Sequence, residues 1–469
     1  MPSTSNKVKT ASLTIDFIVV GGSIAGFATA LGLSRAGHRV TLLEEYDASK
    51  HATGGARSPP NMTKIMEARW GLGQELEKIS LRSDKVSILN FETGDVFGSH
   101  QWDEELMRQT GGLYTVMRQS DLVNMLAVNA ESHGAQIRYN ARVVQMTKGS
   151  IKGGIKPSVT LASGETLSAD IIVGADGPDS TVRRFLLGDT RLGEPTGLLL
   201  WDTLVPWNVL EEDPELSDLA EGKDVLCSWF GPRHAAITYP VRGSAGYNLA
   251  LHVWSPDDGT LTDPGRGSWR ERYPASMLVN AMHDCDPRLA KLARSGKSAT
   301  CVRSFDTPSF EDWVTPDKPV VLIGEAAHPL VAGAMESHAM TIEDAACLAE
   351  LFTHLKALDQ VATFLDAFEE VRRPRVESIR ENEAFNIHFM TLPQGQDRDA
   401  RDEVLRVGHE SGKGVLNAEA AYGEVLKVYA YDAIDEATDW WMKYGILKER
   451  HIGRVDETLD VKIEQRVVE

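Results

Sequence analysis

The sequence predicts an α/β protein in which a parallel nucleotide-binding sheet is combined with an antiparallel-sheet domain and a helical C-terminal region. The segment IDFIVVGGSIAGFATALGLSRAGHRVTLLEE, residues 15–45, reads as strand, glycine turn, helix and strand. Two later segments, ADIIVGADG at 169–177 and DKPVVLIGEAAHP at 317–329, are short apolar strands that end in glycine and an acid. Three separated segments are therefore expected to contribute strands to one sheet.

Changes in residue composition and periodicity along the chain indicate further regions. Aromatic-rich, alternating stretches such as YNLALHVW indicate antiparallel strands, and helical periodicity dominates after them. The expected regions are a disordered N-terminus at 1–12, a nucleotide-binding domain with inserted segments at 13–185, an antiparallel substrate domain at 186–305, completion of the first domain at 306–380, and a helical region at 381–469.

Composition narrows the class of protein. The formal net charge of −19 argues against a nucleic-acid or anionic membrane partner, because phosphates are bound by clustered Lys and Arg. The four cysteines lie far apart without metal-ligand spacing, so neither a disulfide framework nor a metal site is expected. No apolar run approaches the roughly 18–20 residues of a membrane span, and no secretory signal is visible. A cytoplasmic enzyme, monomeric or homodimeric, is expected.

The GGSIAG turn is typical of a dinucleotide site. Gly21 allows the tight turn, Ser23 stands at the usual second glycine, Ala25 lies inside the turn, and Gly26 lets helix and strand pack closely. The helix N-terminus then faces a pyrophosphate. Glu44 follows 18 residues after Gly26, at the end of the next strand, where a carboxylate can accept both hydroxyls of a ribose.

From 14 to 380 the chain resembles the FAD-dependent aromatic hydroxylases, which are single-component flavin monooxygenases similar to salicylate and 4-hydroxybenzoate hydroxylases. The resemblance rests on the order of six motifs. They are GGSIAG with its following acid, GGARSPPN, YTVMRQSDLVNML, GADGPDSTVRR, LIGEAAHP with IEDAACLAEL, and FEEVRRPRV. It implies a Rossmann-like FAD-binding domain joined to the antiparallel-sheet substrate domain.

The resemblance also implies which residues contact FAD. Arg57 lies in the loop expected to pass the flavin, and Arg118 is the expected FAD-contacting arginine. Asp176 and Gly177 belong to the second glycine motif. Glu325 stands where the family carries an Asp that accepts a ribityl hydroxyl. The alternatives are a surface ion pair for Arg118 and a turn-capping acid for Glu325.

One loop departs from the family. Where the family reads Gly-Gln-Gly-Ala-Asn before a helix, this chain has Met335, Glu336, Ser337, His338 and Ala339. Glycines there allow backbone N–H groups to approach the flavin, so side chains require a different approach, and Glu336 would add negative charge near a reduced flavin. The loop length is unchanged. FAD is therefore still expected to bind, with altered redox behaviour, and this loop is expected to border the flavin and the substrate.

Substrate activation is less clearly indicated. Relatives often carry an arginine where this chain has Asp202, preceded by Trp201, and both are expected to line the substrate pocket unless Asp202 is a solvated strand acid. Tyr239 is the candidate catalytic residue, because relatives place a phenol there, and its alternative is a buried core tyrosine. His328 is expected to order its loop, with catalysis as the less favoured role.

The resemblance implies an FAD-dependent monooxygenase that takes electrons from NADPH or NADH, bound transiently, and uses dioxygen to hydroxylate a small aromatic, phenolic substrate, with or without loss of a carboxylate. Orientation and exclusion of water are the tasks of the protein. Two alternatives remain open. One is a flavin epoxidase or oxidase acting on a non-phenolic substrate, and the other is an FAD-binding enzyme with non-redox cyclase activity.

Overall fold

The computed structural model describes residues 9–49, 54–102, 104–188, 193–221, 226–242, 246–254, 267–306, 310, 312–315, 317–412 and 419–447. Its first layer is a five-stranded parallel sheet in the order β19-β12-β1-β2-β8. The strands are β1 (Asp16–Val20), β2 (Arg39–Leu43), β8 (Gln136–Arg138), β12 (Ile171–Gly174) and β19 (Val320–Leu322). In register, Ile18 of β1 lies between Thr41 and Ile172. The predicted convergence of three separated segments in one sheet is confirmed.

Helices and a small antiparallel sheet complete this domain. The central helix α1 (Ile24–Arg35) is buried along most of its length, because it packs against both α5 and α11. The other elements are α5 (Gln119–Ser132), α6 (Thr181–Leu187), α11 (Ser337–Phe352), α12 (Gln360–Met390), α15 (Ala433–Trp440), η3 (Trp441–Gly445), β9 (Val143–Thr147), β10 (Ser158–Leu161) and β11 (Thr166–Ser168). One continuous hydrophobic core joins them, and it includes Trp440 and Trp441.

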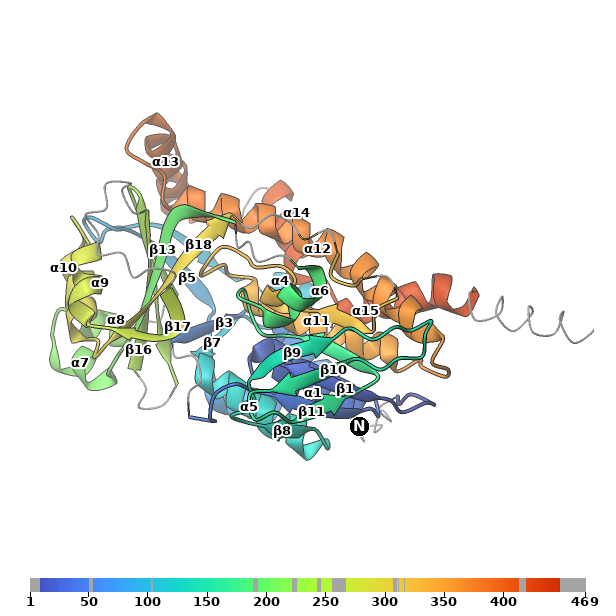
Figure 1. Cartoon of the computed structure of the whole chain (residues 1–469). Helices are drawn as coiled ribbons and strands as arrows, with labels where there is room; N and C mark the ends of the chain where they lie inside the picture. The colour runs from blue at the N-terminus through green and yellow to red at the C-terminus, as the bar shows by residue number, and fades with distance from the viewer. Residues whose placement is uncertain are drawn as a thin grey trace, which may run out of the picture.

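The second layer is an eight-stranded sheet in the order β17-β18-β13-β16-β15-β14-β5-β6, antiparallel except where β14 meets β5. Its strands are β5 (Lys85–Asn90), β6 (Val96–Gln101), β13 (Glu194–Val205), β14 (Leu226–Gly231), β15 (His234–Val241), β16 (Gly246–Trp254), β17 (Gly267–Tyr273) and β18 (Ala299–Asp306). A separate core forms between one face of this sheet and the helices α7 (Trp207–Glu212), α8 (Ser217–Glu221), α9 (Ala275–Ala281) and α10 (Pro287–Ser295). Figure 1 shows these helices on the outer side of the sheet.

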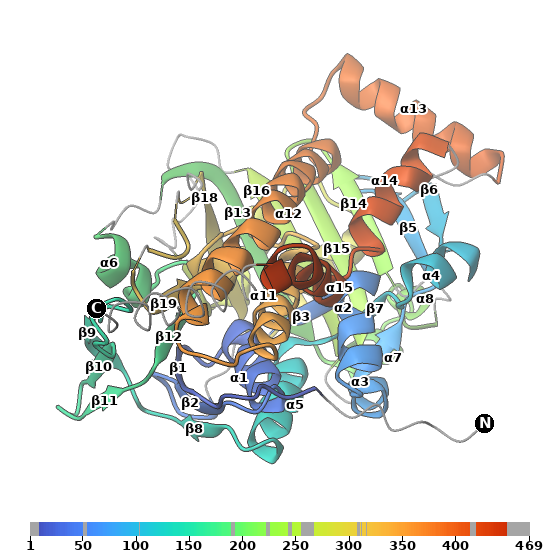
Figure 2. The same cartoon turned by 90° about the vertical axis from the view of Figure 1, so that its right-hand side faces the viewer.

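A three-stranded sheet lies between the two layers (Figure 1). It consists of β3 (Gly55–Ser58), β4 (Ser80–Arg82) and β7 (Thr115–Arg118), and the helices around it are α2 (Pro60–Lys64), η1 (Ile65–Arg69), α3 (Gly73–Ile79) and α4 (Glu104–Thr110). The remaining elements are η2 (Gly324–Ala326), α13 (Gln396–Glu410) and α14 (Glu419–Tyr429). Figure 2 shows the long helix α12 crossing both layers, with α14 beside α2 and α4. The expected fold class is confirmed.

Two expected boundaries differ in the structure. The Ala11 amide donates to the Ala36 carbonyl at 2.9 Å, so the expected disorder of residues 1–12 does not reach Ala11; residues 1–8 lie outside the described residues. Helix α12 runs unbroken through residue 380, and it has buried residues on both sides of that position, Ile379 and Ile387 among them. No helix among the described residues combines the length and apolarity needed to cross a membrane.

A buried ionic cluster links α11 to α12. The Arg372 guanidinium, fully buried, donates to Glu343 at 2.7 Å and to Asp344 at 2.8 Å. Burial alone would raise the pKa of Asp344, but His328 and Arg372 together hold it below its usual value. Removing one partner of such a cluster leaves an uncompensated buried charge.

We therefore expect Arg372→Met to lower the free energy of unfolding by about 3–5 kcal/mol, because two buried carboxylates lose their cation. Arg406→Ala is the control, since its ion pair with Glu403 is exposed and is worth less than about 1 kcal/mol. Urea denaturation followed by circular dichroism measures both. Equal, small effects of the two substitutions would contradict this role for Arg372.

Candidate active site

The glycine turn joins three elements at the carboxyl edge of the parallel sheet. Gly21 has a φ of +108°, and a Cβ on Gly26 would lie 1.8 Å from the Gly21 carbonyl oxygen. Ser23 caps α1 by accepting the Gly26 amide at 3.4 Å, and its hydroxyl donates to the Ala175 carbonyl at 3.1 Å. The positive end of the α1 dipole therefore opens toward this edge, as a pyrophosphate requires.

Glu44 lies at the end of β2 with its carboxylate turned back to the turn. It accepts the Gly22 amide at 2.5 Å and the Tyr46 amide at 2.9 Å. The sequence did not indicate a third partner, Arg270, which comes from β17 of the large sheet and lies 3.4 Å from Glu44. The Arg270 guanidinium also stacks over the Tyr46 ring, 4.4 Å from its centroid. A residue of the second layer thus reaches the position expected for the ribose.

The second glycine motif is joined to the third by Arg183. Its guanidinium is buried, donates to the Ala326 carbonyl at 2.9 Å and lies 4.4 Å from the centroid of the Phe310 ring. Asp176, beside Gly177, accepts the Thr181 amide at 2.6 Å and the Ser180 hydroxyl. Asp176 therefore caps α6, and its contact with a cofactor stays a prediction.

The third motif forms the short turn η2. A Cβ on Gly324, which has a φ of +57°, would lie 3.1 Å from Ala25 of α1, so the first and third motifs meet here. Asp344 accepts the Gly324 amide at 2.8 Å and contacts His328 Nε2 at 2.5 Å. His328 thus orders the loop, as expected. The neighbouring carboxyl of Glu325 has its pKa raised by burial.

Buried carboxylates bind the loop at residues 335–339, which lacks the family glycines. Glu383 of α12 accepts the Met335 amide at 2.8 Å and the Glu336 amide at 3.2 Å. Glu336 is 2% exposed, and its carboxyl accepts the side-chain amide of Asn61 at 2.8 Å. Burial raises the pKa of Glu336 to about 8. This acid is therefore mainly neutral at pH 7, and the negative charge expected from the sequence is largely absent.

The first turn of α11 contains Ser337, His338 and Ala339. Burial, helped by the Arg57 guanidinium, lowers the pKa of His338 to about 4, and the imidazole hydrogen-bonds to the Arg57 backbone. Arg57 itself donates to the Gly333 carbonyl at 2.6 Å. The altered loop therefore lies directly against strand β3.

Arg118 pairs with Gly55 across β3 and β7. Its nearest carboxylate is that of Asp121, at 4.0 Å, which is the limit of an ion pair. The buried Nε atom of Arg118 has no hydrogen-bond partner among the described residues. A buried donor without a partner carries a cost that a bound acceptor relieves, as a cofactor phosphate or carbonyl would.

The face of the large sheet opposite α7–α10 carries the polar residues. Asp202 and His252 lie on neighbouring strands, and Asn248 Nδ2 donates to Asp202 at 3.0 Å. Tyr239 of β15 pairs with Asn248 and shares this face. We call Asp202, Asn248, His252 and Tyr239 the polar face.

The polar face approaches β3 very closely. A Cβ on Gly54 would lie 2.3 Å from Asp202 Oδ1, and a Cβ on Gly55 would lie 2.1 Å from the Tyr239 hydroxyl. A Cβ on Gly333 would similarly lie 2.5 Å from His252 Nε2. Glycines at these three positions therefore let the flavin-side backbone and the polar face meet.

The expectation that Trp201 lines the substrate pocket is wrong. It precedes Asp202 on β13, so its side chain points to the opposite face, where it packs in the core beneath α7–α10 and contacts Tyr273. Neighbouring residues of a strand cannot line the same face. Asp202 is 6% exposed, so the alternative of a solvated acid is also wrong.

Burial makes the polar face mostly uncharged. It raises the pKa of Asp202 to about 7 and that of Tyr239 well above its usual range. It lowers the pKa of His252 to about 3. The Oδ1 atom of Asn248 has no hydrogen-bond partner among the described residues. The face thus offers one titratable acid, a neutral phenol and an unused amide acceptor.

Sequence reasoning did not identify Asn248, His252, Asn61 and Glu383. The alternation of YNLALHVW placed Asn248 and His252 on one face, which was a usable signal. Asn61 ends the GGARSPPN motif, but nothing in the sequence linked it to Glu336, and Glu383 had no signal of its own.

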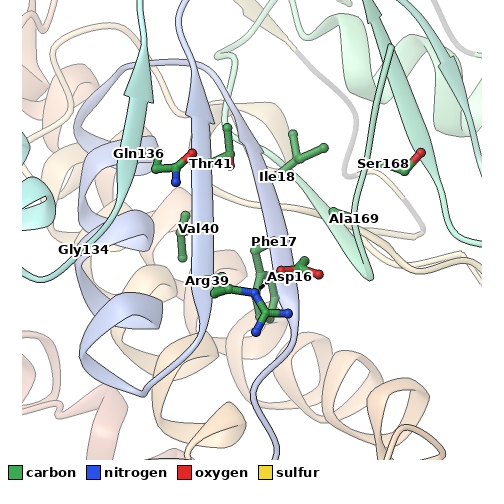
Figure 3. A pocket seen from close by; sticks show the side chains of 10 residues that line it. All are labelled: Asp16, Phe17, Ile18, Arg39, Val40, Thr41, Gly134, Gln136, Ser168 and Ala169. Carbon is green, nitrogen blue, oxygen red and sulfur yellow. Dashed lines mark hydrogen bonds and ion pairs between the residues drawn. The ribbon is translucent and has the colours of Figure 1, made fainter.

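A separate cavity of about 270 Å³ lies at the start of the parallel strands, at the end of β1 away from Gly21 (Figure 3). Asp16 and Arg39 form an ion pair at its rim. None of the expected site residues lines it. Among the described residues, His, Cys, Asp and Glu form no group of three or more suited to a metal ion.

These residues fit an FAD molecule. The turn at Gly21, the buried Glu44 and the unpartnered Nε of Arg118 match a pyrophosphate, a ribose and a further acceptor. We expect Gly26→Ala to weaken FAD binding, because the new Cβ overlaps the Gly21 carbonyl and overpacking costs about 1–3 kcal/mol.

Gly71→Ala is the control, since Gly71 has a positive φ but open space around it, and its cost of about 1 kcal/mol is conformational. Fluorimetric FAD titration of the apoproteins compares the two. An unchanged affinity in Gly26→Ala would show that this turn does not hold the cofactor.

Comparison with known proteins identifies the family. The family model described as FAD binding domain matches residues 14–383. The FAD-dependent monooxygenase OpS4 of Beauveria bassiana is 26% identical over 426 residues, covering 90% of this chain and 96% of the relative. The 3-hydroxybenzoate 6-hydroxylase of Klebsiella oxytoca is 26% identical over 367 residues, covering 77% and 85%. The structure of CtdE in complex with FAD and substrate 4 has a TM-score of 0.75 at 19% identity, covering 93% of this chain and 100% of that one. The chain belongs to the FAD-binding-domain family and is an FAD-dependent monooxygenase.

Proposed function

We propose that this enzyme takes electrons from NADPH or NADH and uses dioxygen to hydroxylate a small phenolic ring held against the polar face. The observation that carries the proposal is the close approach of Asp202 and Tyr239 to Gly54 and Gly55, which lie beside Arg57 in the expected flavin loop. A substrate beside this junction would contact both the cofactor loops and the sheet. Relatives named as hydroxylases of aromatic compounds support the reaction class.

Bound FAD supplies the electron transfer and the oxygen activation. The chain supplies the polarisation of the ring. Asp202, with its pKa raised to about 7 by burial, accepts the proton of a phenol at Oδ1, while Asn248 holds its other oxygen. A phenolate is more electron-rich than a phenol and therefore reacts faster with an electrophilic oxygen. Tyr239, whose pKa is raised by burial, stays neutral and donates a hydrogen bond to the substrate oxygen.

The acid at 202 disfavours a carboxylate on the same side of the ring, because two negative charges in a buried site repel. Two cations are available to an anionic group: Arg57, whose charge acts on both Asp202 and Tyr239, and Arg272, which acts more strongly on Asp202. We therefore favour hydroxylation of a neutral phenol over hydroxylation with loss of a carboxylate.

The experiment is a substrate screen with the FAD-loaded enzyme. Phenols should accelerate flavin bleaching by NADPH or NADH under anaerobic conditions, and hydroxylated product should appear after air is admitted. Carbon dioxide release from hydroxybenzoates would favour the decarboxylating route. Product from an alkene but from no phenol would favour the epoxidase or oxidase. Conversion of a substrate without any flavin reduction would favour a non-redox cyclase and end the monooxygenase proposal.

Asp202→Asn provides the pH test. A base works only when ionised, so hydroxylation by the native enzyme should rise as pH increases through about 7, and Asp202→Asn should lose roughly 100-fold in rate together with this rise. Asp213→Asn, which changes a partly exposed acid paired with Lys291 on the same domain, is the control and should keep the native profile. A native-like pH profile in Asp202→Asn would exclude Asp202 as the base.

A further inference from the structure

Helix α14 of the C-terminal region contributes an aromatic residue to the same side of the large sheet as the polar face. Tyr429, its last residue, is 7% exposed and belongs to one hydrophobic cluster with Tyr114 and Tyr239. Trp102 stacks on Tyr114, with ring centroids 5.4 Å apart, and meets the Tyr429 ring edge-on at 5.8 Å. We call Trp102, Tyr114, Tyr239 and Tyr429 the aromatic wall.

The aromatic wall touches the altered flavin loop through Tyr429. The Tyr429 hydroxyl lies 3.3 Å from the Met335 sulfur, and Glu383 holds the Met335 backbone from the other side. Burial raises the pKa of Tyr429, so its hydroxyl stays protonated and donates to the sulfur. Tyr429 is therefore placed where the loop, the polar face and Arg57 converge.

The end of α14 is fixed by cations from the flavin domain. Lys64 Nζ donates to the Ala430 carbonyl at 2.7 Å, and Arg375 Nη2 donates to the Val428 carbonyl at 2.8 Å. Positive groups at a helix C-terminus satisfy its free carbonyls and its dipole. Arg375 also pairs with Glu343 at 3.2 Å, so the same ionic cluster that holds α11 holds this helix end.

We propose that Tyr429 is a specificity-determining residue whose ring contacts the aromatic substrate and limits its size. This inference rests on the proposed function of the site. Aromatic rings recognise one another by edge-to-face and offset contacts, as Tyr429 already makes with Trp102. The helix that supplies it lies outside residues 14–383, which the family model matches. The size limit is therefore set by a part of the chain beyond the residues that the family model matches.

The test measures ligand selectivity without turnover. Phenol and 2-naphthol are titrated into the oxidised, FAD-loaded enzyme, and binding is followed by the change in flavin absorbance. Tyr429→Ala removes the ring, so the ratio of dissociation constants should shift by about 10-fold or more toward 2-naphthol, the range expected when a pocket gains room. Tyr429→Leu serves the same purpose if the alanine variant does not fold, and it should shift the ratio in the same direction.

Two control variants separate the effect of the Tyr429 ring from other effects of substitution. Tyr429→Phe keeps the ring and should keep the native ratio, and Tyr444→Ala removes an exposed tyrosine of the same C-terminal region and should also keep it. If folded, FAD-loaded Tyr429→Ala or Tyr429→Leu keeps the native ratio of dissociation constants, this inference is overturned, while the proposed function still stands. If the native enzyme binds neither ligand, the proposed phenolic substrate fails as well.

Discussion

The contact on which the site depends is the buried pairing of Arg372 with Glu343 and Asp344. Asp344 holds the Gly324 amide and His328, which shape the turn at Glu325. Glu343 shares the Asn61 amide with Glu336 of the altered loop. One guanidinium therefore helps to fix the turn at Gly324, the altered loop close after it, and Asn61, which is far from both in the chain. A buried cluster of this kind is weak evidence for stability, but it is well suited to holding one arrangement.

The same low-dielectric surroundings determine the charges of the site. Glu336, His338 and His252 are all shifted toward their neutral forms by burial. The altered loop thus keeps a largely uncharged lining although it contains an acid and a histidine. Where the resemblance implies glycines, this chain has buried side chains whose charged forms are disfavoured by desolvation.

The sequence predicted the positions of residues that are determined by local backbone geometry. The turn from Gly21 to Gly26 could be predicted because backbone sterics demand small residues there, and Glu44 because strand length sets its position. Trp201 was misplaced because its strand neighbour was taken to share its face, which the two-residue period of a strand forbids. Glu383 could not be predicted, because only the three-dimensional path of a helix of 31 residues brings it to Met335.

The position of Arg270 couples the two layers at the expected adenosine end of the cofactor. Strand β17 belongs to the large sheet, yet Arg270 lies over Tyr46 and against Glu44. The ion pair is partly exposed and is worth little in stability. A ribose that binds Glu44 has to share this carboxylate with Arg270, so occupation of the expected ribose position and the placement of strand β17 are linked through one side chain.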